Sequence, residues 1–472
     1  MSFATHRTQS REQVLIDDVV LLILEFCDIV SILAMGESSK YLRQLACSKG
    51  VWLAAVSELV RRGIVHRMEG EVLHELSKDQ LVEKVKRAVW GPQTWGREYR
   101  GPPIISREIT LPADHDGLYH FKLTLLPGGQ YLFHLRTRGS QLDCWSIFER
   151  KIIWTHKGGM PSTTIMTFDA QLTTTSDHAV IMSCQRTQRG DLYENFVEVL
   201  TLDLRSGVAQ SRMVARAPDG LGRGHAGPYA HPQISGDFAA VVVVTDIVLI
   251  NWREEVFATI HIHSPSRLFM NFCRLVLTPE HAILLLLGPD KSESLVVCSL
   301  AALPWTLVDG FTIPSGSAAS ASALPKIRIE RLPPSEADTQ TLGSIAMSAY
   351  ESPTQVGLFR VWIHVNRQSL SRSHSYNLDL RSRHPTLELR STTYLGQSTV
   401  QMCGSPFSGH TVQWKAPSSF YLMPPGLHLD GGDSIDRLLE MTERQTSFFQ
   451  ISPYGGALVY GTHDSLVVQY YQ

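Results

Sequence analysis

The stretch ISPYGGALVYGTHDSLVVQYYQ, residues 451–472, carries the pattern that decides the fold. Its apolar run Ala457–Tyr460 follows a turn of Pro and Gly, and a second run, Leu466–Tyr471, follows a polar break. Short runs rich in β-branched and aromatic residues, bounded by Gly, Pro, Asp or Ser, are typical of β-strands. The segment therefore predicts two antiparallel strands joined by a turn.

Hairpins of the same kind recur upstream of this segment. The clearest lie at residues 125–147, 234–252 and 277–298, and weaker ones pair residues 179–182 with 196–200 and 361–364 with 376–380. Recurrence at intervals of tens of residues indicates a repeat array. We therefore predict an all-β domain, a β-propeller with six or seven irregular blades. Because ring closure removes exposed sheet edges, residues 466–471 should share a sheet with an early strand near residues 109–111.

The N-terminal residues have a helical period instead. From Leu15 to Val65 apolar residues recur at the spacing of short helices, and a further helix is predicted from Ser77 to Val89 with a capping box formed by Ser77 and Gln80. The expected helix N-caps are Ser31, Ser38 and Ser39, and the expected stop signals are Gly36 and Gly50. These patterns predict a small all-α domain.

The change of period sets the expected domain organisation. Residues 1–14 are predicted to be a disordered N-terminus, residues 15–65 a helical domain, residues 66–104 a helical spacer and linker, and residues 105–472 a propeller-like interaction domain. The linker is recognised by the helix-breaking segments WGPQTW at residues 90–95 and GPP at residues 101–103.

A pattern within the helical domain resembles the F-box family. It runs without a gap through five segments, namely residues 15–19, 23–24, 28–33, 38–42 and 51–52. The sequence departs from the family pattern at Ile16, where the family has Pro, and at Ser38 and Ser39, where it has Val-Cys. The order of F-box, spacer with paired tryptophans and degenerate WD-like propeller is similar to fungal F-box proteins.

The first helix has more apolar surface than a small domain can bury. Residues 19–24 read VVLLIL, so the helix is apolar almost all the way round, and a unit of about 50 residues hides only a little over half of its surface. One face can pack inside the domain, and the other needs a cover. The resemblance implies that this cover is the Skp-type adaptor, and through it a cullin; the contact residues carried over are Leu15, Ile16, Ile23, Leu24, Ile32, Leu33, Leu42, Val51 and Trp52. The alternative is that the propeller covers this face.

Composition excludes several classes of function. A net charge of -2 with 19% charged residues gives no support for a nucleic-acid partner. The seven cysteines are scattered singly, which favours reduced thiols in the cytoplasm or nucleus. The apolar run at residues 19–24 is far shorter than the ~20 residues that a membrane helix needs, so no membrane segment is expected.

No pattern predicts a catalytic, cofactor or metal site. The glycine-rich string at residues 222–227 is followed by Pro228 and not by a helix, which favours a loop. His261 and His263 would share a strand face without a nearby Cys or acid, so a satisfied or solvent-facing pair is favoured over a metal site. The tryptophans that recur in strand contexts, Trp145, Trp252, Trp362 and Trp414, are expected to pack between neighbouring sheets.

The leading hypothesis is a non-enzymatic substrate-recognition subunit of an SCF-type ubiquitin ligase, whose helices bind the adaptor and whose propeller binds a target protein. A second hypothesis keeps the propeller as an interaction scaffold with a degenerate F-box and no ligase role; the departures at Ile16, Ser38 and Ser39 favour it. A third, an enzyme housed in the propeller, is disfavoured because no acid, His or metal pattern recurs.

Overall fold

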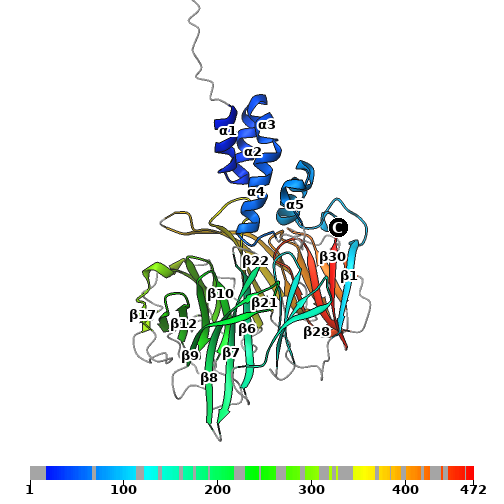
Figure 1. Ribbon diagram of the computed structural model, residues 1–472. Helices are drawn as coiled ribbons and strands as arrows, with labels where there is room; N and C mark the ends of the chain where they lie inside the picture. Colours follow the sequence, from blue (N-terminus) through cyan, green and yellow to red (C-terminus); the bar gives the residue numbers. More distant parts are fainter. Residues whose placement is uncertain are drawn as a thin grey trace, which may run out of the picture.

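The computed structural model places five α-helices on one end of a ring of β-sheets (Figure 1). The residues that the structure describes are 17–65, 71–112, 122–136, 141–158, 163–173, 177–189, 192–216, 229–243, 246–261, 273–287, 293–307, 318–320, 326–327, 344–366, 371–382, 384–394, 400–415, 419–425, 437–439, 445–462 and 464–472. The expected disordered N-terminus, residues 1–14, lies outside them.

The helices occupy residues 17–95. They are α1 (Asp17–Glu25), α2 (Ile29–Ser38), α3 (Lys40–Ala46), α4 (Lys49–Arg61) and α5 (Lys78–Trp90), with short 3-10 turns η1 (Leu73–Glu75) and η2 (Gln93–Trp95). The capping box of α5 is confirmed: Ser77 Oγ accepts from the Gln80 N–H, and the Gln80 side chain accepts from the Ser77 N–H. Ser39 is the N-cap of α3, as expected.

Four expected helix boundaries are wrong. Ser38 is the last residue of α2 and not an N-cap. Asp28, and not Ser31, caps α2, because its carboxylate accepts the Ser31 N–H at 2.7 Å. Gly36 and Gly50 lie inside α2 and α4 and do not end a helix. Gly36 is buried, and a Cβ there would stand 3.4 Å from Cβ of Ala46, so the glycine lets α2 and α3 approach closely.

Seven sheets follow the helices within the described residues, and we number them as blades. Blades 1 to 4 are β2 (Lys122–Leu125), β3 (Tyr131–Leu135), β4 (Leu142–Ser146), β5 (Lys151–His156); β6 (Thr163–Leu172), β7 (His178–Arg189), β8 (Leu192–Asp203), β9 (Ala209–Arg216); β10 (Tyr229–Ser235), β11 (Phe238–Val243), β12 (Asp246–Asn251), β13 (Val256–His261), β17 (Thr306–Leu307), β18 (Ala318–Ser320); and β14 (Cys273–Leu277), β15 (His281–Leu287), β16 (Glu293–Ser299), β19 (Lys326–Ile327). A short 3-10 turn, η5 (Leu300–Ala302), follows β16.

Blades 5 to 7 complete the ring. Their strands are β20 (Ser344–Glu351), β21 (Leu358–Asn366), β22 (Ser371–Asp379), β23 (Thr386–Tyr394); β24 (Val400–Gly404), β25 (Thr411–Lys415), β26 (Ser419–Met423), β27 (Arg437–Leu439); and β28 (Gln445–Ile451), β29 (Ala457–Thr462), β30 (Ser465–Tyr471), β1 (Ile105–Pro112). Each blade contacts the next through its first two strands, from β2 and β6 round to β28, which contacts β2 again. The propeller prediction is confirmed, with seven blades.

Blade 7 closes the ring as predicted. Its outer strand β1 comes from residues directly after the helices and pairs antiparallel with β30, with Ile109 opposite Val468 and Leu111 opposite Leu466. The first and last strands of the described chain therefore share one sheet, which leaves no open edge between blade 7 and blade 1.

Apolar side chains fill six of the seven spaces between blades in the part of the chain that the structure describes. Trp145 and Trp252 lie in two of these clusters, between blades 7 and 1 and between blades 2 and 3, as expected for tryptophans that pack neighbouring sheets. The side chain of Trp414 lies outside the described residues. Burial between blades is thus the main stabilising interaction of the ring.

The space between blades 5 and 6 is polar instead. Val361 and Ile363 face blade 4, so strand alternation turns Trp362 and His364 toward blade 6. On blade 6, Val412 faces blade 7, so Gln413 turns toward blade 5. Both nitrogens of His364, the Trp362 Nε1 and the Gln413 Oε1 are buried and have no hydrogen-bond partner among the residues that the structure describes. Unsatisfied buried polar groups are costly, so this interface contributes less stability than its neighbours.

The helices are fixed to the propeller at blades 5 to 7. The Arg87 side chain donates to the carbonyl oxygens of Gly455 at 3.0 Å and Tyr471 at 2.6 Å, and Thr94 donates from its N–H and its hydroxyl to the Gln472 carbonyl at 2.9 and 2.8 Å. Trp95 is fully buried beside the ring of Tyr471, 5.3 Å between centroids. The helical domain is therefore anchored next to the strand that closes the ring.

Two adjacent glycines at this junction allow a matched test. Gly455 and Gly456 both have positive φ, at 78° and 70°, but a Cβ on Gly456 would lie 2.1 Å from Cγ of Pro92, whereas nothing lies within 4 Å of one on Gly455. Gly456→Ala should lose about 1–3 kcal/mol more stability than Gly455→Ala in urea unfolding, because only the first displaces the helical spacer. Equal losses would show that the helices are not packed this closely on blade 7.

Two buried histidines of blade 5, His364 and His374, should make the stability of the protein depend on pH. Burial lowers the pKa of His364 to about 4, and burial likewise lowers the pKa of His374 to about 4. Both pKa values lie below the value of about 6.5 expected in the unfolded chain. Between about pH 6.5 and about pH 4 the unfolded chain therefore binds more protons than the folded one, and stability is lost as the pH falls through this range. At about pH 5 the loss should be on the order of 2 kcal/mol per histidine. His364→Asn should flatten the fall in melting temperature between about pH 7 and about pH 5; an unchanged slope would contradict the assignment.

Candidate protein-docking surface

Helix α1 has two apolar faces with different surroundings. Val20 and Leu24, four residues apart, are buried in the helical core with residues of α4. The opposite stripe has the spacing i, i+3, i+4, i+7 of a single helix face and is exposed, from 42% at Val19 to 85% at Phe26; its members are Val19, Leu22, Ile23 and Phe26. Such a stripe normally packs against something, so α1 carries more apolar surface than its own domain covers.

Helix α2 continues the exposed surface. Val30 and Leu33 are 40% and 50% exposed, whereas Ile29 and Ile32 on the other side of α2 are buried. Val30 follows Phe26 by four residues, across the turn between α1 and α2. We call Val19, Leu22, Ile23, Phe26, Val30 and Leu33 the outer face.

The outer face stands out from the rest of the surface. Fourteen large apolar side chains are exposed in the described part of the chain, and seven of them lie within residues 17–46: the outer face and Tyr41. Several exposed apolar side chains gathered on two successive helices indicate an interaction site more strongly than single exposed residues do. The Tyr41 hydroxyl donates to Asp17 at 2.7 Å, which ties α3 to the start of α1.

The propeller does not cover this surface. The helical domain meets the ring through α4 and α5, and its core includes Phe407 and Tyr454 from two propeller hairpins. Figure 1 shows α1 at the end of the helical domain away from the sheets. The alternative that the propeller covers the second face of α1 is therefore wrong.

The predicted adaptor-contact residues fall into three groups. Ile23 and Leu33 are exposed on the outer face, and Leu42 is half-buried against the helical core. Leu15 and Ile16 lie outside the described residues. The rest pack inside the helical domain: Leu24, Ile32, Val51 and Trp52. The sequence prediction did not include Val19, Leu22, Phe26 and Val30, although the helical spacing of residues 19–26 was a signal for three of them.

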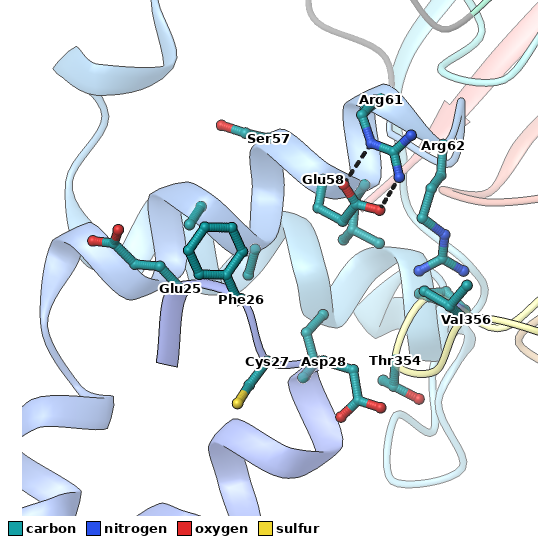
Figure 2. Close-up of a pocket in the computed structure, with 15 residues that line it drawn as sticks. Glu25, Phe26, Cys27, Asp28, Ser57, Glu58, Arg61, Arg62, Thr354 and Val356 are labelled. Carbon is teal, nitrogen blue, oxygen red and sulfur yellow. Dashed lines mark hydrogen bonds and ion pairs between the residues drawn. The ribbon is translucent and has the colours of Figure 1, made fainter. Parts of the chain in front are cut away.

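A groove lies beside the outer face. Its volume is about 720 Å³, and it is lined by the α1–α2 turn, by α4 and by the β20–β21 hairpin of blade 5 (Figure 2). Arg62 at the end of α4 forms an ion pair with Glu351 at 3.1 Å and donates to the Ser352 carbonyl, so the hairpin is held against the helix. The groove is therefore lined by residues of both domains.

The described residues hold no group of three or more His, Cys, Asp or Glu side chains that could bind a metal. The side chain of His261, and His263, lie outside those residues, as does the glycine-rich string at 222–227. Burial raises the pKa of the Cys184 thiol to about 12 and of the Cys298 thiol to about 11, so both stay protonated near neutral pH. Among the described helices, none has the length and apolar character that crossing a membrane requires.

No family model matches the sequence, and no curated protein sequence matches it. Solved structures do resemble the fold. The β-propeller domain of Myceliophteria thermophila Cps50 (Swd1) has 12% identity and a TM-score of 0.46, covering 77% of this chain and 99% of that chain. The N-terminal domain of Nup159 has 10% identity, a TM-score of 0.34 and coverage of 78% and 95%. The WD40 domain of SCAP from fission yeast has 8% identity, a TM-score of 0.36 and coverage of 74% and 84%. At such values these likenesses carry no inference about function.

Proposed function

We propose that this chain is a substrate-recognition subunit of an SCF-type cullin ubiquitin ligase, in which the helical domain binds the Skp-type adaptor and the propeller binds a target protein. The observation that carries the proposal is the outer face. It presents six large apolar side chains to solvent on a domain whose sequence resembles the F-box. An adaptor that covers this face would remove the excess apolar surface from water.

The arrangement of the two domains suits a receptor that holds a target at a fixed place. Anchoring by Arg87, Thr94 and the buried Trp95 leaves little freedom between the helices and the ring. The helices contact the hairpins that join first and second strands, at Glu351, Phe407 and Gly455. Among the described residues the opposite end of the ring carries no helix (Figure 1), and it is the face we assign to the target.

Ser38 and Ser39, which depart from the F-box pattern, both have structural roles in this chain. Ser38 ends α2, with its hydroxyl donating to the Met35 carbonyl at 2.7 Å, and Ser39 caps α3 by accepting the Leu42 N–H at 3.1 Å. The Ser-Ser pair thus forms the junction between two helices, and the helical domain folds without the Val-Cys of the family pattern. The second candidate, an interaction scaffold with no ligase role, rests on these same departures and on Ile16.

Adaptor binding is tested with purified components. Leu22→Asp combined with Ile23→Asp should weaken binding of the Skp-type adaptor at least about 100-fold, because two apolar side chains worth about 1.5–3 kcal/mol each are lost from the contact. Both positions are exposed, so the melting temperature of the variant should stay near that of the wild type. Affinity is measured by isothermal titration calorimetry.

The matched control is Val208→Asp. Val208 is 65% exposed in the hairpin between β8 and β9, far from the helices in sequence and in the ring, so this charge should leave adaptor affinity unchanged. A wild-type chain that does not bind the adaptor, or a double variant that binds as tightly as the wild type, would refute the ligase role and favour the scaffold.

A further inference from the structure

The groove beside the outer face is built by two domains. One wall is the turn from Glu25 to Asp28, the second is α4 from Ala54 to Arg62, and the third is the blade 5 segment that includes Pro353, Thr354 and Val356. Figure 2 shows Phe26 at the turn, the charged residues along α4, and Val356 on the propeller segment beside Arg62. Blade 5 is thus the part of the propeller that reaches the surface formed by α1.

Each domain leaves one large apolar side chain exposed in this groove. Phe26 is 85% exposed and Val356 is 54% exposed, while Ala55 and Leu59 of α4 form the buried floor. Val356 is one of only seven exposed large apolar side chains outside residues 17–46 in the described part of the chain. Exposed apolar side chains that line one groove are removed from water when a partner segment fills it.

The charges of the groove favour a basic partner. The two arginines are neutralised within the chain, because Arg61 pairs with Glu58 at 2.6 Å and Arg62 pairs with Glu351 at 3.1 Å. Glu25 and Asp28 form no ion pair within 4 Å with any residue that the structure describes, although Asp28 caps α2 and also interacts electrostatically with Arg381, which itself pairs with Asp379. The groove therefore carries a net negative charge next to apolar surface, which complements a Lys or Arg beside an apolar side chain.

Phe26 belongs both to the outer face and to the groove, so a partner that covers α1 reaches the groove without a break. We propose that the adaptor that binds the outer face also places a segment in this groove, an apolar side chain next to a Lys or Arg, and so contacts the propeller as well as the helices. This inference rests on the proposed function. The β20–β21 hairpin is then part of the adaptor site, and the adaptor itself helps to fix the orientation of the propeller.

The test uses the full chain and the purified Skp-type adaptor. Val356→Asp should weaken adaptor binding roughly tenfold, because the contact loses a valine side chain and a carboxylate must be desolvated in its place. Glu25→Lys should also weaken binding, and the remaining affinity should depend less on salt. Val208→Asp, an equivalent change in a different hairpin, should bind as the wild type does. Both Val356 and Glu25 are exposed, so melting temperatures should not change.

The outcomes separate this inference from the proposed function. If the wild type does not bind the adaptor, both are overturned. If the wild type binds and Leu22→Asp with Ile23→Asp abolishes binding, while Val356→Asp and Glu25→Lys bind as tightly as the wild type, the adaptor stops at the outer face and only this inference is overturned. If Val356→Asp instead dissociates a dimer of the chain in light scattering and leaves adaptor affinity intact, the occupant is a second copy and the inference is again wrong.

Discussion

The pairing of β30 with β1 is the constraint on which the rest of the structure depends. It closes the ring, and because β1 follows the helical spacer directly, it also determines where the helices lie. The hydrogen bonds from Thr94 to the Gln472 carbonyl and from Arg87 to the Tyr471 carbonyl join the spacer to the closing strand itself. The helical domain is therefore anchored over blades 5 to 7, and its outer face points away from the ring. Ring closure and the position of the outer face therefore depend on the same strand pairing.

Much of the fold could be predicted from the sequence because its signals are local. The hairpin at residues 451–471 and the capping box of α5 need only neighbouring residues, and the expectation that the last strand pairs with residues 109–111 follows from the need to close a propeller. Gly36 and Gly50 lie inside helices because a glycine is tolerated there where another part of the chain approaches closely, and that approach is a tertiary contact.

The candidate site was only partly predictable. Every residue from Val19 to Leu24 is apolar, so the sequence could not distinguish the face with Leu24, which packs against α4, from the face with Ile23, which is exposed. The groove could not be predicted at all, since Arg62 and Glu351 are 289 residues apart and only the folded ring brings them together. The polar space between blades 5 and 6 was hidden for the same reason.

The heat capacity change of adaptor binding tests the central claim most directly, because burial of apolar surface gives a negative value whatever the balance of enthalpy and entropy. It is obtained from calorimetric titrations of the full chain with the Skp-type adaptor at several temperatures. If the outer face is the docking surface, the wild type gives a clearly negative heat capacity change. Phe26→Ser removes the most exposed side chain of that face, so the heat capacity change of this variant is smaller in magnitude. Binding with a heat capacity change near zero, or one that is the same in both proteins, would contradict the account.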